Sequence, residues 1–347
     1  MTTQLKEAVL WQALEDRRVR CGLCNFKCKI SEGKLGQCRV RQNIGGTLYS
    51  LNYHQICSTA VDPIEKKPLF HFQPGSRSLS IAAPGCNFQC DFCQNWQISQ
   101  LPRTQKSLIG RSYNLDDIIN AARQNNCRSI SYTYTEPTVF MELGADCGRL
   151  AKKNGLANIF VSNGYMTIEA LEFARDFLDG INVDLKAFSD QFYQKQCKAS
   201  LEPVLQTLRH IARQTDIWLE VTTLVIPGLN DSDEELKQIA GFIAEDLGEH
   251  VPWHISRFHP DYEQKNGSPT PSETLMRAHE LGLNAGLKYV FIGNLPGSGH
   301  ENTLCHACGK LLIERTGFRI GANNIINGAC PDCGATVPGK DMDPIQI

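Results

Sequence analysis

Three cysteines in one short stretch are the residues of this sequence best placed to do chemistry. Cys86, Cys90 and Cys93 are separated by three residues and then by two. Three thiolates on one loop can each bind one iron of a four-iron, four-sulfur cube. The next cysteine, Cys127, lies too far along the chain to close the same loop. The spacing therefore predicts a cube whose fourth iron is open to another ligand, with a zinc loop or buried thiols as the alternative.

The position of these cysteines favours the iron–sulfur interpretation. An apolar run at residues 79–83 precedes them, and Pro84 and Gly85 end that run just before Cys86. Such a run is typical of a buried strand, and the loops after parallel strands carry the functional residues of many α/β proteins. The spacing resembles the Cys-x-x-x-Cys-x-x-Cys motif of radical S-adenosyl-L-methionine (SAM) enzymes. In that family SAM binds the open iron of a 4Fe-4S cluster through its amino and carboxylate groups.

Two further groups of cysteines have the spacing of metal sites. Each could supply four thiolates to one centre, and together they comprise Cys21, Cys24, Cys28 and Cys38 near the start of the chain, and Cys305, Cys308, Cys330 and Cys333 near its end. The first group spans 18 residues and suits either zinc or a second iron–sulfur cluster, with a slight preference for zinc. The second consists of two Cys-x-x-Cys-Gly knuckles with 21 residues between them, which predicts a zinc ribbon, with rubredoxin-like iron as the alternative.

Polar residues follow the predicted strands and suit the functional groups of SAM. We expect Glu136 to pair with the SAM ammonium and Lys186 with its carboxylate, because each supplies the opposite charge. Asp184 or Asn163 could bind the ribose hydroxyls, and Phe92 offers an aromatic surface for adenine. The set of predicted SAM-binding residues is completed by His259, after the last but one strand. For each residue the alternative is a strand-end cap or core packing.

The elements that must position these residues alternate regularly along the chain. Strands are predicted at residues 79–83, 129–135, 157–162, 181–185, 218–226, 253–258 and 289–292. Helices are predicted near residues 114–125, 138–153, 167–178, 201–213, 232–246 and 271–285. Such alternation predicts a parallel sheet with right-handed crossovers. Six units are fewer than the eight of a closed barrel, so we predict an α/β fold built as an open, partial (β/α)6 barrel.

The rest of the chain is predicted to form appendages to this barrel. Residues 1–20 are expected to be helical, within an N-terminal cysteine-rich and rim segment at 1–77, followed by the barrel at 78–300 and a zinc-ribbon-like tail at 301–347. The prolines of residues 62–75 predict an irregular segment. Its charged residues could line the mouth of a site or form a solvated turn: Asp62, Glu65, Lys66, Lys67 and His71.

Composition limits the classes of function. The chain of 347 residues is 41% hydrophobic and 21% charged with a net charge of −2, which gives no reason to expect nucleic-acid or membrane binding. No apolar run approaches the roughly 20 residues that span a bilayer. We therefore expect a cytoplasmic protein, in which 15 cysteines indicate metal binding rather than disulfides.

Longer segments make the resemblance more specific. Residues 21–294 resemble the radical SAM enzyme of the AmmeMemoRadiSam system, a relative of the pyruvate formate-lyase activating enzymes, and the segments that carry this are 62–75, 85–95, 132–137, 183–186 and 226–231. The resemblance implies reductive cleavage of SAM to a 5′-deoxyadenosyl radical. It also implies association with Memo-type and AMMECR-type proteins. Activating enzymes have Gly-Gly-Glu where this chain has Tyr134, Thr135 and Glu136.

The function predicted from these features is that of a radical SAM oxidoreductase. Its radical would abstract hydrogen from a substrate, with a protein or peptide favoured and a small metabolite as the alternative. A low-potential flavodoxin or ferredoxin is the expected electron donor. The alternative from another class is a zinc-ribbon binding protein on a degenerate barrel, which retention of Glu136 and all three motif cysteines argues against.

Overall fold

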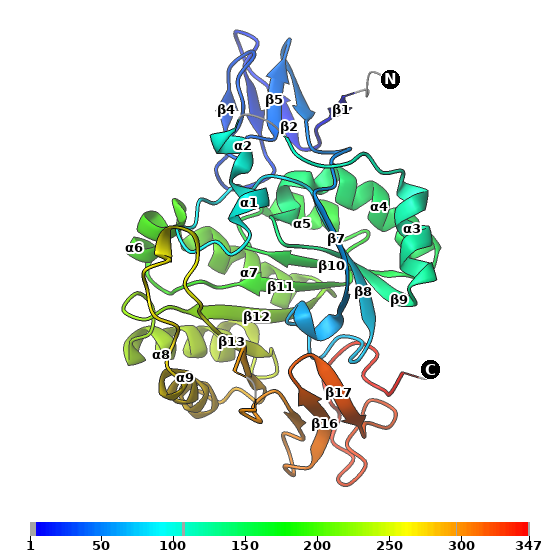
Figure 1. Cartoon of the computed structure of the whole chain (residues 1–347), viewed down its shortest axis with the longest axis vertical. Coiled ribbons are helices and arrows are strands. Elements are labelled where there is room, and N and C mark those ends of the chain that lie inside the picture. The colour runs from blue at the N-terminus through cyan, green and yellow to red at the C-terminus, as the bar shows by residue number, and fades with distance from the viewer. Residues whose placement is uncertain (1–4, 106–107, 296, 346–347) are drawn as a thin grey trace.

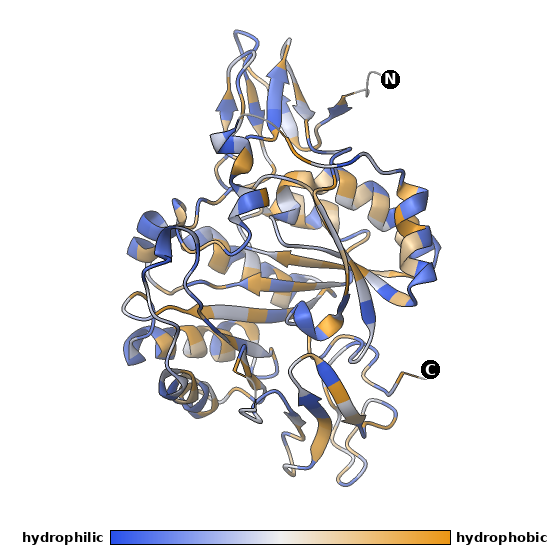
Figure 2. Cartoon of the chain, in the orientation of Figure 1, coloured by the Kyte–Doolittle hydropathy of each residue, from blue (hydrophilic) through white to orange (hydrophobic). Residues whose placement is uncertain are grey.

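The computed structural model describes residues 5–105, 108–295 and 297–345, and its centre is one large sheet. Seven strands of this sheet are parallel and adjacent in chain order, and an eighth pairs antiparallel with the first of them. The parallel strands are β8 (Arg77–Ala82), β9 (Cys127–Tyr132), β10 (Ala157–Ser162), β11 (Gly180–Asp184), β12 (Trp218–Val225), β13 (Trp253–Arg257) and β14 (Val290–Gly293), and the antiparallel strand is β7 (Ser58–Pro63). Figure 2 shows that hydrophobic residues are concentrated along the central strands.

Helices connect the parallel strands and pack their apolar sides on the sheet. The longer ones are α3 (Leu115–Gln124), α4 (Met141–Lys153), α5 (Ile168–Ala174), α7 (Glu202–Gln214), α8 (Asp233–Phe242) and α9 (Ser272–Asn284). Side-chain caps start three of them, with Asn114 accepting from Asp116, Thr167 from Ala170 and Ser232 from Glu235. Shorter turns are η1 (Ile64–Lys66), α1 (Trp96–Ser99), α2 (Leu101–Thr104), η2 (Pro137–Phe140), α6 (Asp190–Phe192), η3 (Tyr193–Cys197), η4 (Ile243–Leu247) and η5 (Tyr262–Gln264).

The sheet is open rather than closed. Its strand order runs from β14 to β7, and within the described residues these two end strands do not pair with each other. The predicted α/β fold and its alternation are confirmed, and the strand limits differ from the predicted ones by a few residues. In the part of the chain that the structure describes, no helix is long and apolar enough to cross a bilayer.

The N-terminal segment differs from the prediction. The helix predicted for residues 1–20 is wrong over residues 5–20, which form strands and turns, while residues 1–4 lie outside the described part. Positive φ angles at Leu10, Asp16 and Arg17 break any helix there. The strands of this segment form two small sheets, and they are β1 (Lys6–Glu7), β2 (Trp11–Ala13), β3 (Val19–Cys21), β4 (Lys29–Ile30), β5 (Arg41–Ile44) and β6 (Thr47–Ser50). Their buried residues join the core of the barrel.

The C-terminal segment forms a small sheet with a core of its own. It contains β15 (Thr303–Leu304), β16 (Leu311–Thr316) and β17 (Arg319–Asn323). Leu312, Ile313, Ile325 and Val337 are buried together beneath it. Figure 1 shows this segment at the opposite end of the molecule from the N-terminal strands.

Candidate functional site

A cavity of about 300 Å³ opens at the carboxyl ends of the parallel strands. The cysteine loop after β8 and the ends of β9 to β13 contribute to its wall. Its polar and cysteine lining consists of Lys66, Lys67, Cys86, Cys90, Cys93, Gln94, Asn95, Ser99, Thr133, Tyr134, Thr135, Glu136, Ser162, Asn163, Asp184, Lys186, Thr222 and Ser256. The parallel arrangement explains this convergence, because the carboxyl ends of all strands meet at one edge of the sheet.

The three motif cysteines share this cavity and are held by neighbouring backbone and hydroxyl groups. The Sγ atom of Cys93 lies 3.2 Å from the Ser99 hydroxyl oxygen. The backbone N–H groups of Gln89 and Asp91 donate to the carbonyls of Cys197 and Gln196, which fixes the loop around Cys90. The side chain of Cys197 lies beside Cys90, and this contact together with burial raises the pKa of the Cys90 thiol. No local sequence signal indicates this position for Cys197.

These residues fit a three-thiolate cluster with a polar ligand. All three thiols are free and line one cavity. The buried Oγ1 of Thr222 and Nδ2 of Asn87 have no hydrogen-bond partner among the described residues. Thr222 is part of the cavity wall, so its hydroxyl is available to a bound ligand. The donor set therefore matches a 4Fe-4S cluster and SAM.

Glu136 is buried in the cavity wall and is held by four donors. Its Oε1 accepts from the N–H of Thr138 at 3.0 Å, the hydroxyl of Thr138 at 2.5 Å and the hydroxyl of Ser162 at 2.9 Å, while Oε2 accepts from the N–H of Asn163 at 2.8 Å. Burial raises the pKa of Glu136, and these hydrogen bonds oppose that effect. The carboxylate thus joins the ends of β9 and β10 as well as lining the cavity.

Asp184 and Lys186 form an ion pair at the end of β11. Lys186 Nζ lies 2.7 Å from Asp184 Oδ2 and 5.8 Å from the centre of the Phe92 ring. Burial lowers the pKa of the Lys186 ammonium, but Asp184 and the neighbouring Cys90 and Cys197 outweigh burial and raise it well above its usual value. The predicted residues Phe92, Asp184 and Lys186 therefore all line the cavity.

Of the other two predicted SAM-binding residues, Asn163 and His259, only the first lines the cavity. Asn163 lines the cavity, and its Nδ2 donates to Asn87 Oδ1 at 2.8 Å and lies 3.9 Å from Cys86 Sγ. His259 is exposed and lies outside the residues that line the cavity. The chain leaves the sheet after β13 ends at Arg257, so His259 does not share the strand-end position that was expected of it.

The rim segment contributes to the site through two lysines. Lys66 and Lys67 line the cavity, and both pair with Asp62, at 2.9 and 2.7 Å. Burial lowers the pKa of Lys67 to about 8 against the opposing effect of Asp62. The hydroxyl of Tyr134 also donates to Asp62, and Tyr134 has a φ of 66°. Glycine adopts a left-handed backbone without strain, and this chain has Tyr134 at that position instead.

Glu65 and His71 neither line the mouth of the cavity nor form a solvated turn, the two alternatives considered for this segment. Both are buried against the C-terminal segment. The Arg315 guanidinium lies 3.7 Å from Glu65 and donates to the Phe70 carbonyl at 2.8 Å. His71 Nδ1 lies 2.8 Å from the Pro338 carbonyl oxygen. Contacts between residues so far apart in the chain have no signal in local sequence.

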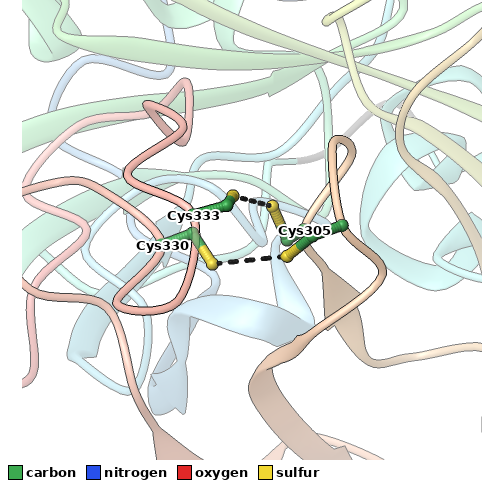
Figure 3. A group of neighbouring side chains, drawn as sticks. Cys305, Cys330 and Cys333 are labelled. Atoms are coloured by element: carbon green, nitrogen blue, oxygen red, sulfur yellow. Dashed lines mark hydrogen bonds between the residues drawn. The ribbon is translucent and has the colours of Figure 1, made fainter.

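The C-terminal cysteines converge on one point. The ligand atoms of Cys305, Cys308, Cys330 and Cys333 all lie within 4.8 Å of one another. The side chains of Cys305 and Cys333 face each other (Figure 3), and their sulfurs are 3.6 Å apart. The sulfurs of Cys308 and Cys330 are 3.7 Å apart. A single tetrahedral ion with bonds of about 2.3 Å places its sulfurs about 3.8 Å apart. This group can therefore bind one metal ion.

The N-terminal cysteines lie around a second, smaller cavity. Cys21, Cys24, Cys28 and Cys38 line it together with Arg41. Three of the four cysteines are buried, and Cys28 is partly exposed. In the C-terminal group all ligand atoms lie within 4.8 Å of one another, and among the described residues the N-terminal cysteines do not form such a compact group. The two groups of four cysteines are therefore arranged differently.

The open parallel sheet and the three-cysteine cavity define the class of radical SAM proteins. The family model of the radical SAM superfamily matches residues 80–242, and the chain belongs to this superfamily. The chain is 45% identical over 335 residues to an uncharacterized protein of Methanocaldococcus jannaschii, and the match covers 96% of this chain and 99% of that protein.

The chain is also similar to a named activating enzyme and to a radical SAM protein of known structure. The chain is 24% identical over 174 residues to the isethionate sulfite-lyase activating enzyme of Oleidesulfovibrio alaskensis, covering 48% of this chain and 56% of that protein. A radical SAM methyltransferase from Sphaerobacter thermophilus has a similar fold, with a TM-score of 0.51, 15% identity, and coverage of 69% of this chain and 71% of that one. The first similarity is a distant homology to activating enzymes, and the second concerns the fold alone.

Proposed function

We propose that this protein is an activase-like radical SAM enzyme whose substrate is a protein or peptide. The observation that carries the proposal is the single cavity shared by Cys86, Cys90, Cys93, Glu136 and Lys186. When bound there, the cluster and SAM supply a 5′-deoxyadenosyl radical by one-electron cleavage of the SAM C5′–S bond. The protein contributes binding, orientation and exclusion of water.

The residues of the cavity take distinct roles in this proposal. The three motif cysteines hold three irons of the cluster. Glu136 accepts a hydrogen bond from the SAM ammonium, and Lys186 donates to the SAM carboxylate. Phe92 packs beside the adenine, and Asn163 or Asp184 binds the ribose hydroxyls.

Two observations support a protein or peptide as substrate. The first is the distant homology to an activating enzyme. The second is the open sheet, whose end strands β7 and β14 do not pair with each other in the described chain. Lys66, which lines the cavity, is 45% exposed. A chain that enters beside Lys66 would meet this exposed ammonium at the rim of the cavity. A hydrogen of that chain could then approach the reactive carbon.

The proposal includes partners and a structural metal. A flavodoxin or ferredoxin of low potential supplies the electron. The resemblance to the radical SAM enzyme of the AmmeMemoRadiSam system makes Memo-type and AMMECR-type proteins the first substrates to test. Zinc is the proposed metal of the C-terminal cysteines, since four thiolates in tetrahedral arrangement suit it.

Isotope transfer tests the choice of substrate. Reconstituted protein is incubated anaerobically with SAM, a reductant and a uniformly deuterated partner protein of the Memo or AMMECR type. We expect faster formation of 5′-deoxyadenosine than without the partner, and deuterium in that product. If the protein partners have no effect while a small metabolite gives both stimulation and deuterium transfer, the substrate is a small molecule and the proposal is wrong.

A further inference from the structure

The space between the N-terminal cysteines is wider than the space that four ligands of a single metal ion leave between them. It is lined by the sulfur-bearing residues Cys21, Cys24, Cys28 and Cys38, and its free space is about 10 Å³. That volume corresponds to about one water molecule. Four thiolates around a single zinc lie about 3.8 Å apart and leave no such space between them. The C-terminal cysteines, with sulfurs 3.6 and 3.7 Å apart, show that compact arrangement in the same chain.

A buried cation indicates that the occupant of this cavity is an anion. Arg41 lines the cavity and is only 2% exposed. Its Nη2 donates to Glu142 at 2.5 Å, but its Nε and Nη1 are buried without a partner among the described residues. Buried guanidinium N–H groups that lack an acceptor are costly. A metal cluster bound by four thiolates is net anionic. It would therefore accept hydrogen bonds from Nε and Nη1 of Arg41.

The surroundings of this cavity suit an iron–sulfur cluster better than a surface zinc knuckle. Three of its four cysteines are buried, whereas Cys308 and Cys333 of the C-terminal group are exposed. Leu23, Ile30 and Val139 add an apolar wall. The N–H of Gln37 donates to Cys28 Sγ at 3.4 Å. Low solvent exposure and hydrogen bonds to sulfur are the means by which proteins adjust iron–sulfur potentials.

The cavity also adjoins the loop that carries the motif cysteines. A Cβ atom added to Gly85, the residue before Cys86, would lie 3.2 Å from the Cys38 carbonyl oxygen and 2.6 Å from Val40 Cγ1. The loop around Cys24 pairs with Met166, just after β10. In the view of Figure 1, α2, which follows the motif cysteines in the chain, is drawn at the base of the N-terminal strands.

We propose that Cys21, Cys24, Cys28 and Cys38 bind a second 4Fe-4S cluster, with all four irons ligated by protein, next to the SAM site. A cube separates its cysteine sulfurs more than one ion does, because each thiolate binds a different iron. This assignment replaces the slight preference for zinc that spacing alone gave. It goes beyond the proposed function and does not depend on SAM cleavage or on the identity of the substrate.

The test removes the SAM cluster and asks what iron remains. The triple variant Cys86→Ala, Cys90→Ala, Cys93→Ala of the full chain is purified and reconstituted anaerobically, and iron, sulfide and zinc are measured. We expect about four irons and four sulfides per chain, from one remaining cube. The reduced variant should give a cubane electron paramagnetic resonance signal that added SAM does not change.

A matched set of variants assigns that iron to its ligands. Adding Cys24→Ala and Cys28→Ala to the triple variant should remove the remaining iron, whereas adding Cys57→Ala, a thiol outside all three groups, should leave it. If the triple variant instead contains no iron, and the N-terminal pair of substitutions in the otherwise wild-type chain removes one zinc, the proposal is overturned.

Wild-type protein provides a second measurement should the triple variant fail to fold. It is expected to contain about eight irons per chain after reconstitution, and about four would contradict the proposal. The experiment measures metal content and spectra, not activity. A failure of the proposed SAM reaction would therefore not change the iron count and can be told apart from a failure of this proposal.

Discussion

Replacing Glu136 by Gln tests how the cavity holds a buried carboxylate. Among the described residues the Glu136 carboxylate accepts four hydrogen bonds, three at Oε1 and one at Oε2. The amide –NH₂ group of Gln is itself a donor. It must therefore face either the three donors at Oε1 or the single donor at Oε2. The less costly orientation directs it toward the N–H of Asn163, where one hydrogen bond to a charged acceptor is lost.

The expected magnitude follows from that lost bond. A hydrogen bond to a charged group contributes about 1.5–3 kcal/mol, and the other three become neutral and weaker. Release of the buried charge offsets part of this weakening. We therefore expect the free energy of unfolding to fall by about 2–3 kcal/mol, and SAM affinity to fall about tenfold or more because the ammonium loses its charged partner.

Two assays separate the two effects. Anaerobic urea unfolding gives the change in stability if the slope stays constant, and equilibrium dialysis gives SAM affinity at equal cluster content. Ser162→Ala is the control, because it removes one donor to Oε1 but keeps the carboxylate. It should lower stability by about 1 kcal/mol with SAM affinity near wild type. Wild-type SAM affinity in Glu136→Gln would refute the ammonium contact, and unchanged stability would refute the hydrogen-bond reasoning.

Three further predictions concern other parts of the molecule. Lys186→Met leaves Asp184 unpaired at the cavity and should weaken SAM binding about tenfold, or about 1.4 kcal/mol, with unchanged iron content; equal affinity by dialysis would contradict the contact with the SAM carboxylate. Cys308→Ser should remove zinc and lower the thermal midpoint, since metal binding is coupled to folding; elemental analysis that finds no zinc in fresh wild-type protein would contradict this. Burial lowers the pKa of His71 from 6.5 to about 4, so the unfolded chain binds a proton that the folded chain does not between these values, and stability should fall by about 3 kcal/mol as the pH drops through that range. Urea unfolding at pH 7 and pH 4 should show a smaller loss in His71→Gln than in wild type, and equal losses would refute this origin.

The sequence predicted those features whose signals are local. Apolar runs and their alternation with helical segments located the parallel strands and their helices, because periodicity acts over a few residues. The spacing of Cys86, Cys90 and Cys93 indicated their chemistry. The positions of Glu136 and Lys186 followed from the rule that the carboxyl ends of parallel strands meet at one edge of the sheet.

Features that depend on distant contacts were not predictable in this way. Cys197 lies beside Cys90 only because η3 packs against the cysteine loop. Glu65 and His71 are buried by residues more than 200 positions later in the chain. The N-terminal strands are too short to show a hydrophobic periodicity. The positive φ angles of Asp16 and Arg17, which prevent a helix there, are not indicated by any hydrophobic pattern in the sequence.

The central claim is that the three motif cysteines bind the cluster that reduces SAM. The most direct measurement incubates the reconstituted protein anaerobically with SAM and dithionite and quantifies 5′-deoxyadenosine, for wild type and for Cys90→Ala. The wild type should form 5′-deoxyadenosine, and Cys90→Ala should form none and lose about four irons per chain, because two thiolates cannot hold the site-differentiated cube. Formation of 5′-deoxyadenosine by Cys90→Ala at the wild-type rate, or none by iron-replete wild type, would contradict the claim.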